Sequence, residues 1–405
     1  MKKVVITGMS GITALGNDAD SIFSKLLKGK TATQRMPWDH IDGLNTRLAA
    51  PINDFEFPKA SRKKTRSMGK VSKLATLATS QALSDANLLN QQDILSNGKT
   101  GIAYGSCSGS PEPLSELLSI LTEEKIGNVN ATTYIKGMSH TCAVNLALFF
   151  GITGRLIPTS SACTSSSQAI GYAYENIKYG MQDIVIAGGA EELCLSQVAI
   201  FDTFFATSQK NDNPEHVPRP FDKDRDGLVI GEGATTLILE SLEHAQNRGA
   251  KIYAEVVGYG TNCDSEHVTQ PTADKIQIAL ELALKDAKIK AGEVDYVNAH
   301  GTSTELGDIA ESIATSKVFN KDMNISSLKG YFGHTLGACG ALEAWLSIEM
   351  MNRGLIIPNV NLLEVDNRCA KLNYLKKPKK TDLNYIMSNN FAFGGVNTSL
   401  IFKKF

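Results

Sequence analysis

The hydrophobic positions of this chain form short continuous runs that alternate with amphipathic segments. Largely apolar runs predict strands at residues 4–7, 100–105, 183–191, 235–239, 251–259 and 398–402, and the continuous run at 183–191 is typical of a strand buried on both faces. Apolar residues at helical spacing predict helices over residues 71–90, 114–122, 275–288 and 336–351. Because strands alternate with helices along the whole chain, the pattern predicts an α/β fold with largely buried sheets.

Two halves of the chain share this organisation. No low-complexity segment or obvious linker divides the sequence, and the polar stretch at residues 243–251 is the best candidate for a boundary. We therefore predict an N-terminal half, residues 1–245, and a C-terminal half, residues 246–405. In both halves apolar strands end in polar residues within small-residue turns, a plan that would suit an old duplication.

Two segments imitate ligand-binding loops. Glycines 8, 11 and 16 follow the first apolar run, so we predict a buried strand that ends in a glycine-rich turn; the spacing fits neither a dinucleotide-binding nor a phosphate-binding loop. The acidic run at residues 222–227 imitates the opening of a calcium-binding loop, but Gly233 stands where the closing glutamate is required. The sequence therefore predicts no nucleotide site in the first segment and no metal site in the second.

Composition narrows the class of protein. The 405 residues are 42% hydrophobic and carry a formal net charge of −1, which gives no electrostatic reason to bind nucleic acid or an anionic membrane. The seven cysteines form no CxxC pair, so reduced thiols and a cytoplasmic location are expected. The first apolar run is too short for a signal peptide, and no stretch approaches the roughly 20 apolar residues of a membrane helix. We expect a soluble, enzyme-sized globular protein without a membrane span.

Cys163 lies among small residues between an expected strand at residues 155–159 and an expected helix that includes Ala169. The free N–H groups and positive dipole end of a helix N-terminus stabilise a thiolate, so Cys163 is a candidate nucleophile. A buried cysteine in a tight turn would explain this stretch equally well by itself. The choice between the two therefore depends on partner residues elsewhere in the chain.

His300 and His334 supply these partners, because each follows the end of an expected strand and is followed by small residues. A lone histidine in such a place would more often be structural, but three such turns together indicate one shared site. A cysteine with a nearby histidine suits acyl transfer, since the imidazole exchanges the proton while the sulfur holds the acyl group. A second histidine suits stabilisation of an enolate oxygen better than plain hydrolysis.

Four motifs surround these residues: Ser161-Ala162-Cys163-Thr164-Ser165, Asn298-Ala299-His300-Gly301-Thr302-Ser303-Thr304, Lys329 with Gly333-His334, and Asn390-Phe391-Ala392-Phe393-Gly394-Gly395-Val396-Asn397. In this order and spacing they resemble the β-ketoacyl-acyl carrier protein synthases, nearest the synthase II subfamily, and the resemblance runs the whole length of the chain. It implies the thiolase-like five-layer αβαβα fold, built from two similar halves, and a dimer.

The resemblance also implies a role for each motif residue. Cys163 would take an acyl chain from acyl carrier protein, and its backbone N–H and that of Phe393 would form the oxyanion hole. His300 and His334 would hydrogen-bond the thioester oxygen of malonyl carrier protein, so that loss of CO2 leaves an enolate that attacks the acyl group. The remaining roles are an orienting ion pair of Lys329 with Glu311, binding of the carrier's phosphopantetheine arm by Thr302 and Thr304, gating by Phe393, and further substrate contacts by Phe391 and Gly394. No metal and no permanently bound cofactor are expected.

Two departures from the family pattern bear on the substrate. Glu305 stands where proline is usual, and Ser108 occupies a pocket position that is usually a bulky aliphatic residue. Together with softer markers, they make the chain look most like the ketosynthases of bacterial aryl polyene pathways, which extend conjugated chains, generally beside a chain-length-factor-like partner. The predicted partners are therefore acyl and malonyl carrier proteins and a second ketosynthase chain, identical or paralogous. The basic run at residues 63–66 is either a solvated face or a dock for an acidic carrier.

Three alternative functions stay open at this level. Housekeeping fatty-acid elongation shares every catalytic residue and differs only in pocket shape. A non-catalytic chain-length-factor-like subunit would typically lack the cysteine that is present here. A cysteine–histidine hydrolase would leave the second histidine and Lys329 without a role.

Overall fold

A computed structural model describes residues 1–127 and 129–405. Within the described residues, eleven strands form one continuous hydrogen-bonded order, β13-β11-β10-β15-β16-β9-β1-β8-β6-β4-β5. The strands of the N-terminal part are β1 (Val4–Thr13), β4 (Thr100–Gly105), β5 (Leu156–Thr159), β6 (Ile184–Glu191) and β8 (Gly233–Ser241). Those of the C-terminal part are β9 (Ala254–Cys263), β10 (Tyr296–Asn298), β11 (Asn324–Ser326), β13 (Asn373–Tyr374), β15 (Tyr385–Phe391) and β16 (Val396–Lys403).

The two parts of the sheet repeat one plan of strand directions. Counting outward from the centre, β1-β8-β6-β4-β5 and β9-β16-β15-β10-β11 are each joined by two antiparallel and then two parallel pairings. The short antiparallel pairing of β1 with β9 joins the two parts. This repeat confirms the expectation of two similar halves, while the position of the boundary near residue 245 stays a prediction.

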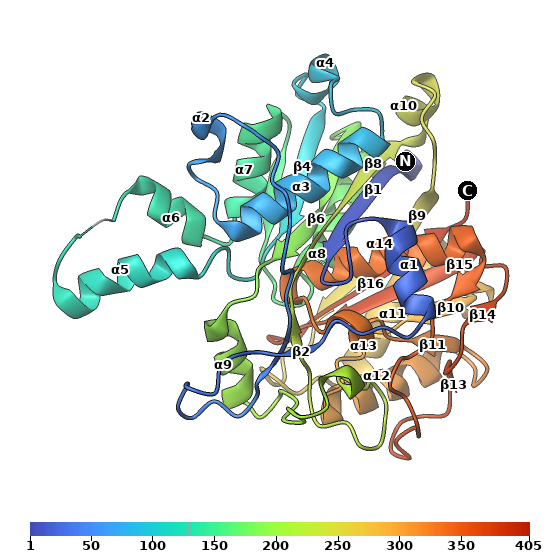
Figure 1. Cartoon of the computed structure of the whole chain (residues 1–405). Coiled ribbons are helices and arrows are strands. Elements are labelled where there is room, and N and C mark those ends of the chain that lie inside the picture. Colours follow the sequence, from blue (N-terminus) through green and yellow to red (C-terminus); the bar gives the residue numbers. More distant parts are fainter. Residues whose placement is uncertain (128) are drawn as a thin grey trace.

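Helices form three layers around the two half-sheets (Figure 1). The middle layer consists of α8 (Ser165–Lys178) and α14 (Cys339–Arg353), which contact strands of both halves. One outer layer contains α3 (Lys70–Asp85) and α7 (Thr141–Phe150), and the other contains α11 (Ala273–Ala287) and α12 (Glu305–Val318). Helix, sheet, helix, sheet and helix therefore follow one another, which is the predicted five-layer α/β architecture.

Shorter elements complete the chain. They are α1 (Ala19–Leu27), α2 (Arg62–Thr65), α4 (Gln92–Leu95), α5 (Glu112–Glu123), α6 (Ala131–Gly137), α9 (Leu195–Thr203), α10 (Leu242–Asn247), α13 (Lys329–Phe332), the 3-10 turns η1 (Pro214–His216), η2 (Ala291–Glu293) and η3 (Leu336–Ala338), and the minor strands β2 (Gln34–Arg35), β3 (Leu48–Ala50), β7 (Ile230–Gly231), β12 (Leu355–Ile356) and β14 (Lys379–Lys380). Among the helices described, none is long and apolar enough to cross a membrane.

The glycine-rich turn predicted after the first apolar run is wrong, because β1 continues through Gly8 and Gly11 to Thr13. These glycines serve close packing. A Cβ at Gly8 would lie 2.4 Å from the Ala82 carbonyl oxygen of α3, and one at Gly11 would lie 2.3 Å from the Trp345 ring of α14. The glycines therefore let a helix approach each face of the central strand.

The candidate residues all follow the carboxyl ends of sheet strands. Cys163 follows the carboxyl end of β5, His300 follows β10, the Lys329 to His334 segment follows β11, and Phe393 follows β15. Ligands of α/β proteins bind outside the carboxyl ends of parallel strands, so the topology predicts one shared site here.

Candidate active site

Cys163 sits in a sharp turn between β5 and the N-terminus of α8. Ala162 has a φ of +47°, a conformation that L-residues rarely adopt. Two side chains fix the turn: Thr164 Oγ1 donates to the Ser161 carbonyl and Ser165 Oγ to the Ala162 carbonyl, each at 2.7 Å. The cysteine is only 5% exposed. Its sulfur therefore lies at the N-terminal end of α8, as the sequence predicts.

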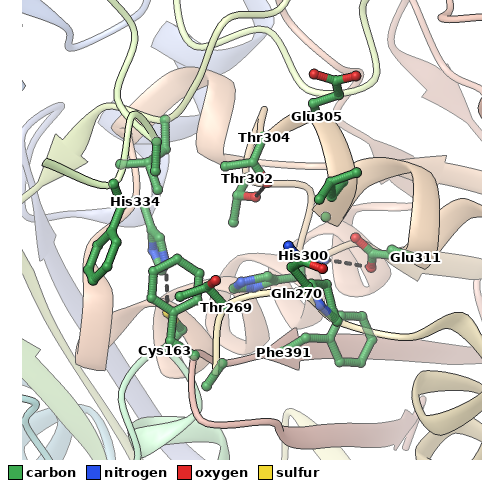
Figure 2. A pocket seen from close by; sticks show the side chains of 18 of the residues that line it. Cys163, Thr269, Gln270, His300, Thr302, Thr304, Glu305, Glu311, His334 and Phe391 are labelled. Atoms are coloured by element: carbon green, nitrogen blue, oxygen red, sulfur yellow. Dashed lines mark hydrogen bonds between the residues drawn. The ribbon is translucent and has the colours of Figure 1, made fainter. Parts of the chain in front are cut away.

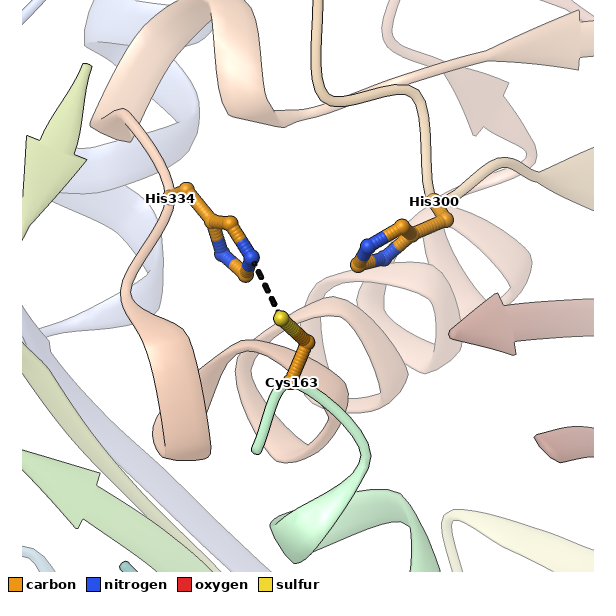
Figure 3. Close-up of side chains that lie close together, drawn as sticks. All are labelled: Cys163, His300 and His334. Carbon is orange, nitrogen blue, oxygen red and sulfur yellow. Dashed lines mark hydrogen bonds between the residues drawn. The ribbon is translucent and has the colours of Figure 1, made fainter. Parts of the chain in front are cut away.

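The two histidines face this sulfur from separate loops (Figure 3). His334 Nε2 lies 3.0 Å from Cys163 Sγ. The two imidazole rings are 5.3 Å apart between centroids and nearly perpendicular, at 85°. The three residues therefore surround one small space, which confirms that the three separate turns meet.

The hydrogen bonds of the other ring nitrogens fix where each imidazole carries its proton. The Leu336 N–H donates to His334 Nδ1 and the Lys329 ammonium donates to His300 Nδ1, both at 3.2 Å. Because Nδ1 accepts in both rings, the proton of each neutral ring is on Nε2. Burial, reinforced by the charge of Lys329, lowers the pKa of both histidines well below the usual value. Both rings therefore stay neutral and present an Nε2–H to the space beside Cys163.

A metal ion is a poor occupant for this space. Cys163, His300 and His334 do bring possible ligand atoms within 4.8 Å of one another. A ligating imidazole, however, normally donates the N–H of its other nitrogen to a neighbour, whereas here both Nδ1 atoms accept. The buried Lys329 ammonium would also repel a cation. Two N–H donors directed at an anion that develops during a reaction fit this arrangement better.

The ionisation of Cys163 is set by opposing effects. Burial raises the pKa of the Cys163 thiol to about 11, while the Lys329 charge and the backbone N–H groups of Phe393 and Cys163 itself lower it. The backbone N–H groups that hydrogen-bond the Cys163 sulfur can also donate to the carbonyl oxygen of a substrate that reacts with this sulfur. These two N–H groups are the ones that the resemblance assigns to the oxyanion hole.

The predicted ion pair of Lys329 with Glu311 is wrong, because the partner of Lys329 is Glu343 of α14. Lys329 Nζ lies 2.5 Å from Glu343 Oε1 and 2.6 Å from the His300 carbonyl oxygen. The other Glu343 oxygen accepts from Asn390 Nδ2 at 2.7 Å. Glu343 raises the pKa of Lys329 against the effect of burial. Lys329 is therefore a buried cation that fixes the tautomer and position of His300.

Glu311 holds His300 in another way. Its two carboxylate oxygens accept the backbone N–H groups of His300 and Gly301, both at 2.8 Å. Gly301 has a φ of +38°, and a Cβ there would lie 2.5 Å from the Ser327 side chain. Burial raises the pKa of Glu311 to about 8, and the two N–H groups oppose that shift. Glu311 therefore fixes the backbone turn that carries His300, without an ion pair to Lys329.

Lys329→Met is expected to destabilise the protein by about 3–5 kcal/mol, because it leaves the buried Glu343 carboxylate without its counter-charge. Replacing both partners, with Lys329→Met and Glu343→Met together, should restore most of this loss, since no unpaired charge then remains. Urea denaturation of both variants measures the difference. A double variant as unstable as the single one would contradict the assignment of Glu343 as the partner.

A cavity of about 370 Å³ leads to the three residues (Figure 2). Of the residues predicted from the sequence, it is lined by Cys163, His300, Thr302, Thr304, Glu311, His334, Phe391 and Phe393. The hydroxyl oxygens of Thr302 and Thr304 lie 2.8 Å apart on one wall. The loop at residues 264–271 and the aromatic residues after α9 form further walls that sequence reasoning missed. Asp264 and His267 of this loop stand in none of the motifs that identified the site, so no local signal pointed to these segments.

Phe393 lies at this cavity within a short glycine-containing turn. Its ring stacks on Phe201 at 5.5 Å between centroids, and its edge contacts Phe204. Gly394 and Gly395 follow with φ values of +87° and +78°, and the Gly394 N–H donates to the Val268 carbonyl at 2.7 Å. Gating by Phe393 stays a prediction, and this turn is the part of the wall where it would occur.

Ser108 is not among the described residues that line this cavity. It lies in the turn after β4, where its N–H donates to Glu191 Oε1 at 3.2 Å and the Cys107 N–H donates to Glu191 Oε2 at 2.7 Å. The Ser160 hydroxyl donates to the Cys107 carbonyl at 3.3 Å, which joins this turn to the turn of Cys163. The role of Ser108 in an acyl pocket therefore stays a prediction.

Family models match both parts of the chain. The beta-ketoacyl synthase N-terminal domain matches residues 1–245, and the beta-ketoacyl synthase C-terminal domain matches residues 253–363.

Relatives and solved structures are similar along the whole chain. A 3-oxoacyl-[acyl-carrier-protein] synthase 2 from Vibrio harveyi is 36% identical over 413 residues, covering 100% of this chain and 99% of that protein. The crystal structure of a beta-ketoacyl synthase from Burkholderia phymatum is 56% identical, with a TM-score of 0.98 and full coverage of both chains. A ketosynthase in complex with its chain length factor from Xenorhabdus doucetiae is 26% identical, with a TM-score of 0.85, covering 100% of this chain and 98% of that one.

Proposed function

The chain belongs to the β-ketoacyl synthase family, and because it is therefore a condensing enzyme of the acyltransferase class, we propose that it elongates an acyl chain held on Cys163 with malonyl-acyl carrier protein. The products are a 3-oxoacyl carrier protein two carbons longer and CO2. The observation that carries this proposal is the pair of neutral imidazoles that present their Nε2–H groups beside Cys163.

Acyl transfer to Cys163 is the first step. The sulfur attacks the thioester carbonyl of an acyl carrier protein, a carbon–sulfur bond forms, and the carrier's sulfur leaves with the proton that the Cys163 thiol gives up. Negative charge develops on the carbonyl oxygen during the attack. The backbone N–H groups of Cys163 and Phe393 would receive that charge.

Decarboxylation and condensation follow. The bond between the malonyl methylene carbon and its carboxylate breaks, CO2 leaves, and the electron pair forms an enolate. The enolate oxygen would accept hydrogen bonds from the Nε2–H groups of His300 and His334. The enolate carbon then attacks the acyl carbonyl on Cys163, a carbon–carbon bond forms, and the sulfur leaves and regains a proton from solvent. Neutral imidazoles suit this task because they donate a hydrogen bond without a change of charge.

The carrier delivers both substrates on a phosphopantetheine arm, which is a substrate group and not a resident cofactor. The paired hydroxyls of Thr302 and Thr304 line the cavity that leads to Cys163, and they would hydrogen-bond the amides of this arm.

Two classes of acyl chain are compatible with this site. Conjugated chains, as in aryl polyene biosynthesis, are favoured by the sequence departures at Ser108 and Glu305. Saturated chains of ordinary fatty-acid elongation fit the similarity to the 3-oxoacyl carrier protein synthases equally well. We propose the conjugated class.

A competition experiment tests the proposed function and the chain class together. The protein is given equal amounts of a saturated and a polyenoyl carrier protein of equal length, followed by malonyl carrier protein with a ¹³C label at the methylene carbon. Mass spectrometry of the carrier should show the label in a 3-oxoacyl product two carbons longer, mainly from the polyenoyl chain. Labelled product from the saturated chain alone would overturn the polyene proposal, and the absence of any labelled product would overturn condensation.

Ser108→Leu is expected to shorten the longest chain that is accepted, because the leucine would add about three carbon atoms of volume to a position that the resemblance assigns to the acyl pocket. The product lengths from a mixture of carrier-bound chains measure this, with Ser84→Leu, at an exposed position near the end of α3, as the control. An unchanged distribution of products would remove Ser108 from the pocket.

We also propose that a second copy of the chain covers the arm made by α5 and α6, which extends from the body in Figure 1. Helix α5 has no buried residue, and its apolar side chains Leu118 and Leu121 are 57% and 79% exposed. A cluster of this kind on an ordered helix normally marks an interface. The ketosynthase from Xenorhabdus doucetiae is in complex with its chain length factor.

Light scattering should therefore give about twice the chain mass of 43.7 kDa for the native protein. Leu118→Asp with Leu121→Asp should give the single-chain mass, while Ile278→Asp, at an exposed position on α11, should stay dimeric. A native protein that is monomeric alone and pairs only with a paralogous ketosynthase chain would contradict the homodimer and favour the heterodimer.

A further inference from the structure

A four-residue turn, Thr302 to Glu305, connects His300 with helix α12 and carries both cavity-lining threonine hydroxyls (Figure 2). Glu305 is the first residue of α12, and its side chain points away from the threonines in Figure 2. It is also the position at which the sequence departs from the family pattern.

The backbone of this turn is fixed from the protein interior by Arg225, whose side chain is 1% exposed. Its Nε donates to the Thr304 carbonyl at 3.2 Å, and its Nη2 donates to the Glu305 carbonyl at 2.9 Å. On the other side, Asp308 accepts the Ser303 N–H at 3.1 Å. Backbone groups of three consecutive turn residues are thus fixed by two buried charges.

The side chain of Glu305 constrains the same turn from its solvent-exposed side. Its carboxylate accepts a hydrogen bond from Nη1 of Arg368, and the two side chains are 61% and 52% exposed. Arg368 Nη2 donates to Asp366 at 2.7 Å, and Asp366 accepts from Arg225 Nη1 at 2.6 Å. The charges therefore form a closed path from the Glu305 side chain through Arg368, Asp366 and Arg225 to the Glu305 carbonyl.

The side-chain charges along this path alternate in sign, because Asp366 lies between the two arginines and Glu305 pairs with the outer one. Arg368 and then Arg225 keep the pKa of Asp366 well below its usual value, so this carboxylate is ionised throughout the neutral range. Asp366 also joins the path to the neighbouring backbone, because its N–H donates to the Phe221 carbonyl at 2.9 Å. A family-typical proline at position 305 could make none of the side-chain contacts of Glu305.

We propose that Glu305 and Arg368 are positioning residues whose ion pair fixes the turn that presents the Thr302 and Thr304 hydroxyls, and that the pair thereby sets the affinity for the pantetheine arm. This inference rests on the proposed function, because it takes the arm as the ligand of the two hydroxyls. It assigns the pair to binding of the arm and not to chemistry at Cys163, which neither side chain contacts.

The test compares two alkylating reagents that react with Cys163 by the same step. The sulfur attacks the chloromethyl carbon of a chloroacetamide, a carbon–sulfur bond forms and chloride leaves. One reagent is chloroacetamide itself, and the other carries the chloroacetyl group on the amine of aminopantetheine, the analogue in which an amine replaces the pantetheine thiol. Intact mass spectrometry gives the rate constant of alkylation for each reagent. The ratio of the two rate constants measures how much binding of the arm accelerates the reaction, and no catalytic turnover is needed. Cys163→Ala identifies labelling at other cysteines.

The native protein should react faster with the pantetheine reagent. Glu305→Gln and Arg368→Gln should each lower the ratio of rate constants by about two- to fivefold, as expected for loss of one partly exposed ion pair. The double variant should match the single ones, because both substitutions remove one interaction. The chloroacetamide rate should stay unchanged. Lys317→Gln, which breaks an exposed ion pair with Asp274 at the other end of α12, should leave the ratio at the native value.

Two results would overturn the inference, and they differ in what they imply for the proposed function. A native preference for the pantetheine reagent that all variants keep would show that the arm binds without help from Glu305 and Arg368, and the proposed function would stand. No native preference would contradict binding of the arm at the two threonines, and the proposed function would then fail with the inference. With carrier substrates, the variants should raise KM for malonyl carrier protein and leave kcat unchanged.

Discussion

Cys163→Ala is expected to lower elongation by a factor of about 10⁴ or more, while the protein still decarboxylates malonyl carrier protein. The methyl group of alanine cannot form the acyl thioester. The two Nε2–H donors are held by Lys329, Leu336 and Glu311, and none of these contacts involves the cysteine sulfur. The donors should therefore keep their positions, and the enolate that they stabilise can still form and take a proton from water.

The measurement is release of ¹³CO2 from carboxyl-labelled malonyl carrier protein, set beside the yield of elongated product from the same reaction. Cys369→Ala, a buried cysteine outside the cavity, serves as the control and should keep both activities. Elongation by the Cys163→Ala variant would show that the nucleophile has been assigned to the wrong residue.

His300→Ala and His334→Ala are each expected to lower malonyl decarboxylation by about 10²–10³-fold, the usual cost of removing one donor to a developing oxyanion. The two variants should differ in acyl transfer. His334 Nε2 lies 3.0 Å from Cys163 Sγ, so its loss should also slow acylation. His300 is fixed by Lys329 and Glu311 instead, and its variant should still become acylated on Cys163.

The pH dependence of decarboxylation gives a second test of the same donors. Because burial and Lys329 keep the pKa of both histidines well below the usual value of about 6.5, neither ring gains a proton between pH 8 and pH 6. The rate of the Cys163→Ala variant should therefore show no loss with a midpoint near pH 6.5. A change nearer pH 8 would come from the Glu311 carboxyl, because burial raises its pKa to about 8. A loss of rate with a midpoint near pH 6.5 would show that an imidazole titrates and would contradict the neutral donors.

Much of the fold follows from the sequence, because continuous apolar runs mark buried strands. The run at residues 100–105 is β4 to the residue, and the run at 183–191 differs from β6 by one residue. The turn predicted after the first run is wrong because glycine marks turns at some positions and close packing at others. At Gly8 and Gly11 it serves close packing of helices that lie about 70 and more than 300 residues further along the chain, which a local pattern cannot reveal.

In the candidate site, too, a local sequence pattern reveals some residues and cannot reveal those whose role depends on packing. Cys163, His300 and His334 could be found because each stands in a turn with a motif, and the carboxyl ends of the strands bring those turns together. Glu343 could not be found, because a glutamate within a largely apolar helix has no local signal, and its role arises only where α14 passes Lys329. Charge pairs between distant elements depend on packing, and packing is decided by the whole chain.

The central claim is that Cys163 carries the growing acyl chain and passes it to a carbon nucleophile made from malonyl carrier protein. Intact mass spectrometry after incubation with acyl carrier protein tests this most directly. The account predicts a mass increase equal to the acyl group, located on the peptide that contains Cys163, which disappears when malonyl carrier protein is added as a product two carbons longer appears on the carrier. An acyl group that leaves Cys163 as free acid, with no longer product, would contradict the account and indicate a hydrolase.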